Sequence, residues 1–123
     1  MMSGMIFEQR QILKANVDFS DGTGTKSRPV VIISHNKHNN SSDDLICCPI
    51  TSDVKGRGQM IFPKDYELES VTLPVPQSEI KSQYPMILHK SRLKPLQTAR
   101  IKITKELAKK VFDDIQAILE IPK

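Results

Sequence analysis

Two apolar runs, rich in β-branched residues and separated by a polar segment, constrain the fold of this chain more than any other feature. Residues 28–34 read RPVVIIS and residues 45–52 read LICCPITS. Runs of this length and composition are typical of buried strands. Between them, residues 35–44 carry mainly Asn, Ser, His and Asp side chains and predict a polar loop. The pattern predicts an antiparallel hairpin, with Pro29 at the start of its strand or on an edge, where no ladder donor is missed.

Further short strands are predicted on both sides of this hairpin. They lie at 12–19, 60–62, 71–73, 78–81 and 85–88. The first of them has Leu13, Ala15, Val17 and Phe19 on one face. A loop of small and polar residues at 20–27 and a turn at 53–58 separate strands from the hairpin. Because little chain remains for crossover helices, the pattern favours a small antiparallel β-barrel.

The C-terminal segment changes to helical periodicity. Its apolar residues recur three and four positions apart, at Leu107, Ala108, Val111, Phe112, Ile115, Ile118 and Leu119. Thr104 is a suitable N-cap, and Pro122 marks the end. We expect this stripe to be buried against the barrel, although a helix that binds a partner would carry the same stripe. The expected fold is mainly β with a C-terminal helix, an α+β class, in one domain of 1–123.

Composition narrows the choice of partners. The chain has 123 residues, of which 38% are hydrophobic and 26% charged, and its net charge of +4 favours a polyanionic partner. Four cations fall in two turn-like segments, namely Lys26, Arg28, Lys55 and Arg57. A solvated surface is the alternative interpretation of these charges. Aromatic residues make up only 5%, which argues against a platform for base stacking.

The cysteines and the hydropathy pattern bear on localisation. Cys47 and Cys48 are adjacent in an apolar run, and neighbouring cysteines rarely form a disulfide, so we expect free thiols in a reducing compartment. No apolar stretch is long enough for a signal peptide or a membrane span. We therefore expect a cytoplasmic protein with no membrane partner.

Familiar catalytic and cofactor motifs are missing from the sequence. The patterns GxxxxGK[ST], GxSxG and HExxH do not occur. His35 and His38 are three residues apart in the polar loop, but no third ligand at a suitable spacing accompanies them, and His89 is isolated. We expect no metal site and no cofactor.

A possible phosphate site follows from the register of the hairpin. If the two apolar runs pair around the polar loop with Ser34 opposite Leu45, Arg28 lies opposite Thr51, with their Cβ atoms about 4.5–5.5 Å apart. A guanidinium binds phosphate through parallel hydrogen bonds and stabilises charge on its oxygens. The alternative is a surface charge beside an ordinary strand residue, and a slip of one position would place the two on opposite faces.

These residues lie in two signatures of a known toxin family. Residues 22–34, GTGTKSRPVVIIS, resemble the G-x-(K/R)-x-RP-hydrophobic-S signature of the MazF/PemK toxin family. Residues 48–52, CPITS, resemble its P-I-T-S signature. Residues 91–93 and the terminal helix also fall where the family has them, and the resemblance covers residues 10–120. Two signatures in this order and at this separation make a specific match.

The resemblance implies a fold, an activity and partners. It implies an SH3-like barrel, shared with the gyrase poison CcdB, and a homodimer that is the toxin of a type II toxin–antitoxin system. It further implies metal-independent cleavage of single-stranded RNA, in which the ribose 2′-OH attacks the adjacent phosphate and leaves 2′,3′-cyclic phosphate and 5′-OH ends. The partners are then single-stranded RNA and a cognate antitoxin.

The resemblance also implies that Arg28 and Thr51 are the catalytic pair. Arg28 would neutralise charge on the phosphoryl oxygens, and Thr51 would donate a hydrogen bond to one of them. A guanidinium stays protonated near neutrality, so the base is unassigned, with His35 as a candidate. The expected RNA-binding residues are Gly22, Gly24, Lys26, Ser52, Lys55 and Arg57, in which the glycines let a loop move over the substrate and the cations hold flanking phosphates.

The chain departs from the family pattern near its first strand. Many relatives carry Gly-Asp where this chain has Arg10-Gln11, and the first loop is of the shorter type, so base preference does not carry over. One alternative is a CcdB-like gyrase poison, but residues 120–123, EIPK, lack the expected aromatic or apolar tip. A non-catalytic RNA-binding barrel is the other, against which the presence of both Arg28 and Thr51 argues.

Overall fold

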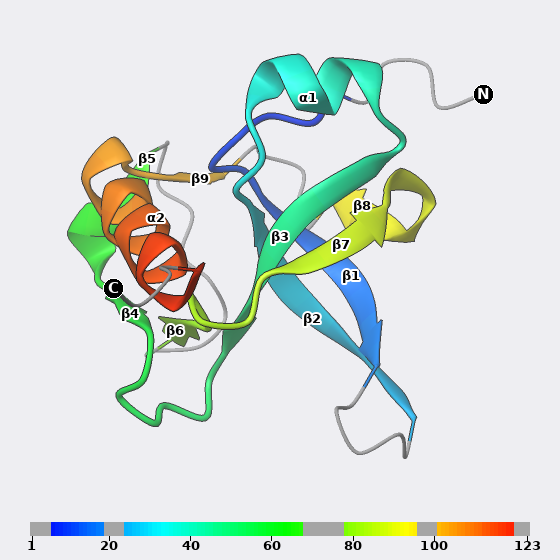
Figure 1. The fold of residues 1–123 in the computed structure, drawn as a ribbon. Coiled ribbons are helices and arrows are strands. Elements are labelled where there is room, and N and C mark those ends of the chain that lie inside the picture. The colour runs from blue at the N-terminus through cyan, green and yellow to red at the C-terminus, as the bar shows by residue number, and fades with distance from the viewer. Residues whose placement is uncertain (1–5, 19–23, 68–77, 96–100, 120–123) are drawn as a thin grey trace.

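The fold is mostly antiparallel β-sheet with one long C-terminal helix (Figure 1). The computed structural model describes residues 6–18, 24–67, 78–95 and 101–119. Its elements are β1 (Ile12–Asp18), β2 (Thr25–Ile32), α1 (Asn36–Ser41), β3 (Asp44–Thr51), β4 (Gln59–Ile61), β5 (Tyr66–Glu67), β6 (Ser78–Ile80), β7 (Met86–His89), β8 (Leu93–Pro95), β9 (Lys102–Ile103) and α2 (Lys105–Leu119). Two 3-10 helices, Pro63–Asp65 and Lys90–Arg92, complete them. The predicted α+β class is confirmed.

β3 is the strand around which the sheet is organised. One edge pairs with β2, and the other pairs with β7 near the start of β3 and with β6 at its end. On that second edge Ile50 faces Ile80 whereas Cys47 faces Met86, so three steps along β3 correspond to six along the other edge. The extra residues, within 81–85, leave the ladder and allow the sheet to bend there, as a bulge does.

The bend leaves the sheet open where the sequence predicted a closed barrel. The strand order is β4-β6-β3-β2-β1-β8, with β7 branching from β3, and among the described strands β4 and β8 at the two ends do not pair with each other. β5 and β9 form a separate two-stranded sheet. The spacing of apolar runs indicates short antiparallel strands, but it carries no information about a branch point on one strand edge.

Successive residues of the central strands face two different hydrophobic clusters. α2 packs on the first face, where Ile12, Val31, Cys48, Ile50, Ile80, Leu107 and Val111 are buried together. The opposite face buries Leu13, Ala15, Val30, Ile32, Leu45, Cys47 and Leu93. Because side chains alternate along a strand, Arg28 in β2 and Thr51 in β3 extend the second of these rows. Both residues therefore lie on the face that α2 does not cover.

The terminal helix is confirmed, but its apolar stripe is only half buried. Thr104 caps the helix as predicted, because its Oγ1 accepts a hydrogen bond of 3.3 Å from the backbone N–H of Leu107. The first two turns pack in the core, whereas Phe112, Ile118 and Leu119 are exposed. A cavity of about 780 Å³ lies beside this part of α2, lined by Ile33, Ser34, Ile46, Pro85, Phe112, Ile115, Gln116 and Leu119. The expectation that the barrel covers the whole stripe is wrong.

Of two local predictions in the hairpin, the polar loop needs correction, and for Pro29 the edge alternative holds. Residues 35–44 contain the helix α1, because His35 caps it and the buried Asn39 side chain binds the backbone carbonyl of Ser34 at 2.8 Å. Pro29 lies inside β2, not at its start. β2 pairs with β3 only from Val30 onward, so on that side Pro29 still occupies an unpaired edge.

Several predicted features lie outside the described residues, namely Phe19, the strand at 71–73 and Pro122. None of the helices in the described part of the chain is long and apolar enough to cross a membrane.

Candidate active site

The hairpin register agrees with the prediction wherever the two strands pair. Val30 faces Pro49 and Ile32 faces Cys47, which is the expected alignment. Near the α1 end the register differs from the prediction, which placed Ser34 opposite Leu45. The N–H groups of Ile33 and Ser34 instead both donate to the carbonyl of Ile46, at 2.9 and 3.2 Å. Continued by two residues in the other direction, the register aligns Arg28 with Thr51.

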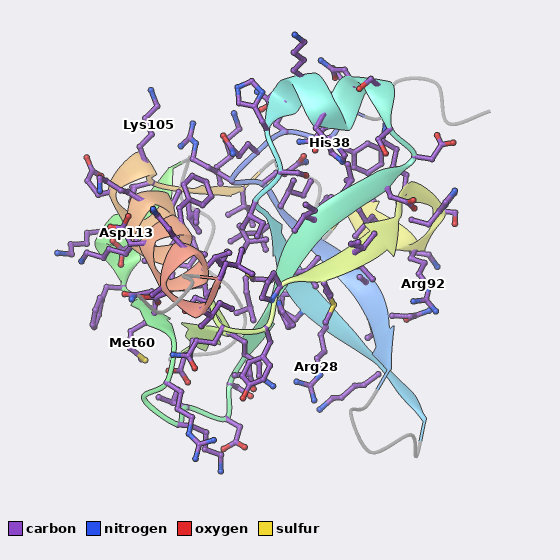
Figure 2. The ribbon with its side chains drawn as sticks, viewed as in Figure 1. Arg28, His38, Met60, Arg92, Lys105 and Asp113 are labelled. Atoms are coloured by element: carbon purple, nitrogen blue, oxygen red, sulfur yellow. The ribbon has the colours of Figure 1, made fainter. Side chains whose placement is uncertain are left out.

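With the register continued in this way, Arg28 and Thr51 belong to one row of residues that crosses five strands. Within the ladders Ala15 faces Arg28, Thr51 faces Glu79, and Glu79 faces Met60. Arg28 and Thr51 are both half-buried. In Figure 2 Arg28 projects below β2, toward the side of the molecule on which the turn after β3 also lies. The row thus brings a guanidinium, a hydroxyl and a carboxylate to one end of the face that α2 leaves uncovered.

The Thr51 hydroxyl is oriented by the backbone that follows it. Its Oγ1 accepts a hydrogen bond of 3.0 Å from the N–H of Asp53. This contact occupies a lone pair and leaves the hydroxyl hydrogen to donate elsewhere. The local sequence explains the contact, because a Thr at the end of a strand commonly binds the N–H two residues on as the chain turns. Thr51 is therefore held as a hydrogen-bond donor at the sheet end.

Glu79 is the charged residue that sequence reasoning missed. It is only 2% exposed, and its two carboxylate oxygens accept hydrogen bonds from the N–H groups of Lys55, at 2.9 Å, and Gly58, at 2.8 Å. Burial alone would raise the pKa of this carboxyl, but hydrogen bonds from the backbone of residues 55–58 outweigh burial and hold the pKa below its ordinary value. Glu79 thus binds the turn after β3 as a carboxylate.

The turn itself is shaped to approach β6. Gly56 has φ +73°, a conformation that favours glycine, and a Cβ on Gly58 would lie 1.9 Å from the carbonyl oxygen of Ile80. These two glycines, together with a lone acidic residue in a short strand, are the sequence signals that point to the contact with Glu79. A lone Glu in a short strand is more often a solvated residue, which is why the signal was missed.

The other predicted RNA-binding residues are exposed where they are described. Lys26 is exposed in β2, two positions before Arg28 and therefore on the same face. Ser52, Lys55 and Arg57 are exposed in the turn after β3, where Lys55 Nζ lies 3.5 Å from the Asp53 carboxylate. Gly24 is exposed at the start of β2, and Gly22 lies outside the described residues.

His35 is at the wrong end of the hairpin to act on a substrate at Arg28 and Thr51. Its Nδ1 accepts a hydrogen bond of 3.0 Å from the N–H of Lys37 and so caps α1. Six or seven strand residues separate it from Arg28, which corresponds to about 20 Å. His35 is thus engaged as the cap of α1 at the other end of the hairpin, and the base stays unassigned.

Other reactive groups are placed away from this row or are inert. Burial raises the pKa of both Cys47 and Cys48 to about 12, with the neighbouring thiol adding to the effect at Cys47, so neither is a ready nucleophile. Across the described ranges, no three His, Cys, Asp or Glu side chains come together in a group that could hold a metal ion.

Solved structures of similar fold come from toxin–antitoxin systems. A chain of the MazE–MazF complex (Form III) from Deinococcus radiodurans matches with a TM-score of 0.64 and 18% identity, over 96% of this chain and 100% of that one. An endoribonuclease in complex with its cognate antitoxin from a mycobacterial species matches with a TM-score of 0.64 and 18% identity, over 99% of each chain. The Mycobacterium tuberculosis toxin MazF-mt6 matches at 0.65 and 16%, over 93% and 100%. At these identities the likeness establishes a shared fold.

Sequence comparison identifies the family directly. No curated protein sequence matches the chain. The model of a family described as PemK-like, MazF-like toxin of type II toxin–antitoxin system matches residues 8–121, which includes both signatures and almost the whole chain. The chain therefore belongs to the PemK-like, MazF-like toxin family of type II toxin–antitoxin systems.

Proposed function

We propose that this protein is a metal-independent endoribonuclease that cuts single-stranded RNA at the face carrying Arg28 and Thr51. The observation that carries the proposal is the β2–β3 register, which pairs Val30 with Pro49 and, continued by two residues, aligns Arg28 of one family signature with Thr51 of the other. A fold shared with an endoribonuclease from a mycobacterial species supports it.

The chemistry follows from the properties of the two side chains. The 2′-oxygen of one ribose forms a bond to the adjacent phosphorus, and the bond from phosphorus to the 5′-oxygen of the next nucleotide breaks. The 2′-OH loses a proton and the leaving 5′-oxygen gains one, which gives 2′,3′-cyclic phosphate and 5′-OH ends. We assign stabilisation of the phosphoryl charge to Arg28 and a donated hydrogen bond to Thr51. His35 has no role in this scheme.

RNA binding beyond the scissile phosphate is assigned to residues around this row. Lys26, Lys55 and Arg57 contribute charge for flanking phosphates, with Ser52 as a hydrogen-bonding group. Gly22 and Gly24 precede β2 in the sequence, and we assign both to RNA binding because glycine lets a backbone approach a substrate closely. An acidic segment of a cognate antitoxin would compete with RNA for the same cations.

We further propose a cytoplasmic homodimer. Two buried free thiols suit a reducing compartment. The exposed apolar half of α2 and the cavity beside it, with Ile46 and Ile87 exposed on the neighbouring strands, provide an apolar surface that a second copy of the chain would cover. The part of this surface that α2 contributes lies on the face of the sheet opposite to Arg28 and Thr51.

The decisive experiment compares matched variants in cleavage of a labelled single-stranded RNA of mixed sequence. Arg28→Ala should lower the cleavage rate by about 10²–10³-fold or more, because one partner of the transition-state charge is lost. Thr51→Val should also be slow, whereas Thr51→Ser keeps the hydroxyl and should stay close to wild type. Wild-type activity should persist in excess chelator.

Each arm has an outcome that contradicts the proposal. Cleavage by Arg28→Ala at the wild-type rate would show that the site is elsewhere, and full activity of Thr51→Val would remove its hydroxyl from the mechanism. Activity lost in chelator and restored by magnesium or zinc would overturn metal independence. An inert wild type that instead inhibits gyrase would favour the gyrase-poison alternative.

A further inference from the structure

We infer that Glu79 is a positioning residue of the RNA site, whose buried carboxylate fixes the cationic turn at 55–58 beside Thr51. The inference rests on the proposed function, because it explains how that site presents Lys55 and Arg57 to RNA. The carboxylate itself does not touch the reacting atoms. It acts through the backbone of the turn, and the row that Thr51 shares with Glu79 sets the distance between turn and hydroxyl.

The first step of the argument is the placement of Glu79 directly opposite Thr51. The two residues are partners in the antiparallel ladder of β3 and β6, so their side chains lie on the same face. Ile80, the next residue, is fully buried on the other face against the cluster that contains α2. β6 is thus fixed from behind by the core, which keeps Glu79 on the same face as Thr51.

The second step is the way in which the carboxylate binds the turn. Oε1 accepts the N–H of Lys55 and Oε2 accepts the N–H of Gly58, and the backbone of residues 56 and 57 adds to the hydrogen bonding of the ionised group. Successive N–H groups converging on one anion form the geometry of a backbone anion nest. Here the anion is a side chain of the protein, so the nest holds the turn closed.

The third step is the direction in which the two cations project. The N–H groups of Lys55 and Gly58, on either side of Arg57, donate to Glu79, whereas the side chains of Lys55 and Arg57 are exposed. An unconstrained turn of six residues, 53–58, would spread these charges over many conformations. Holding it lowers the entropy lost when phosphates bind, which is how preorganisation raises affinity.

The charge of Glu79 would otherwise be unfavourable at this place. A carboxylate close to a site for phosphate repels it, and a buried carboxylate requires strong hydrogen bonds. Because both oxygens face backbone donors, the charge is directed into the turn and away from the substrate. The exposed Asp53 carboxylate has no such role: its side chain pairs with Lys55 Nζ.

The test compares Glu79→Gln with Asp53→Asn. Both variants remove one negative charge from the same region, but only the first removes an acceptor of backbone N–H groups, since a glutamine amide has one acceptor oxygen and two donors. In Glu79→Gln the amides of residues 55–58 should exchange with solvent at least about tenfold faster than in wild type, whereas Asp53→Asn should retain wild-type protection.

Function is measured on the same mixed-sequence RNA for cleavage and on its 2′-O-methyl form for binding. Glu79→Gln should raise KM about tenfold with a much smaller change in kcat, and should reduce the slope of log affinity against log salt by about one. Asp53→Asn should bind as tightly as wild type or more tightly. The combined variant Lys55→Ala with Arg57→Ala should weaken binding strongly in the wild-type background and only slightly in the Glu79→Gln background.

The outcomes separate this inference from the proposed function. If the wild type neither binds nor cuts RNA, the proposed function fails, while the exchange data still decide whether Glu79 holds the turn. If the wild type cuts RNA but Glu79→Gln matches Asp53→Asn in every assay, the inference is wrong. Exchange of wild-type amides 55–58 at the rate of an unprotected peptide would also overturn it, and that measurement needs no variant.

Discussion

Arg10 shows how the surrounding structure can hold one residue in a strained backbone conformation. It has φ +78°, where residues that carry a Cβ are strained by about 1–2 kcal/mol. The position is fixed from both sides, because its N–H donates to Ile32 O at 2.7 Å and its carbonyl accepts the N–H of Ile103 at 2.9 Å. The Arg10 Nη1 also donates to Ile103 O at 2.9 Å, which offsets part of the strain.

This geometry predicts an inverted order of stability for two small substitutions. Arg10→Ala loses the side-chain hydrogen bond and keeps the strain, whereas Arg10→Gly loses the bond and removes the strain. Arg10→Gly should therefore be more stable than Arg10→Ala by about 1 kcal/mol in urea denaturation, although glycine usually destabilises. An alanine variant as stable as the glycine variant would show that the backbone at this position is relaxed.

Glu79 predicts a defined pH dependence of stability. Its folded pKa is lowered, so its carboxylate stabilises the fold above the ordinary glutamate pKa of about 4.3, and this contribution disappears as pH falls through the folded pKa. The free energy of unfolding of wild type should exceed that of Glu79→Gln in full above about pH 5, and the gap should narrow on acidification. A gap that stays constant from pH 7 to pH 3 would contradict the assignment.

Among the elements, α2 is attached to the sheet by a polar contact as well as by its apolar face. Asp114 Oδ2 accepts hydrogen bonds from Gln59 Nε2 at 2.8 Å and from Ser82 Oγ at 2.6 Å. The contact links α2 to β4 through Gln59, and to the segment between β6 and β7 through Ser82. Ser82 is fully buried, so its hydroxyl depends on this acceptor.

Asp114→Ala should therefore destabilise the fold by about 1–3 kcal/mol, since it leaves two donors without their acceptor. Asp113→Ala is the matched control. Asp113 is exposed and contacts Lys109 Nζ at 3.2 Å, a surface pair whose loss should change stability by less than about 0.5 kcal/mol. Chemical denaturation of both variants measures the difference, and equal losses would show that the buried contact is dispensable.

The sequence predicts some elements well and others not at all, for reasons visible in single residues. The strand β2 is indicated by the β-branched run at its end, and the helix α2 by the spacing of apolar residues from Leu107 to Leu119. In both, the apolar residues of the sequence repeat with the period of the element that they form. α1 was missed because its cap is His35, not one of the usual Ser, Thr, Asp or Asn caps, and because its one buried residue is the polar Asn39, which binds the Ser34 carbonyl. Glu79 was missed because the N–H groups it binds belong to a turn more than twenty residues earlier.

At the scale of the whole molecule, the two faces of the sheet have separate tasks in the proposed protein. One carries the RNA site, and the other holds α2, whose exposed end lines the apolar cavity. Leu119 is 72% exposed at this end. An exposed apolar surface of this kind is unfavourable in water unless another molecule covers it.

We expect the wild type to sediment as a dimer and Leu119→Asp to raise the dimer dissociation constant at least about tenfold, because a carboxylate would enter the apolar contact. Lys110→Glu is the control, since Lys110 is exposed on α2 but does not line the cavity. Sedimentation velocity over a concentration series measures both. A wild type that remains monomeric at all concentrations would contradict the dimer, and equal effects of the two variants would place its interface elsewhere.

β3 also determines where this chain can change in length. Its alternate residues belong to two separate cores, with Cys47 on one and Cys48 on the other, so deletion or insertion of one codon within the strand would exchange both sets of side chains at once. The edge facing it already holds extra residues between β6 and β7, outside the ladder. In a library of single-codon insertions, variants with the insertion within 44–51 should therefore fail to fold. Variants with the insertion between Ser82 and Pro85 should still yield folded protein.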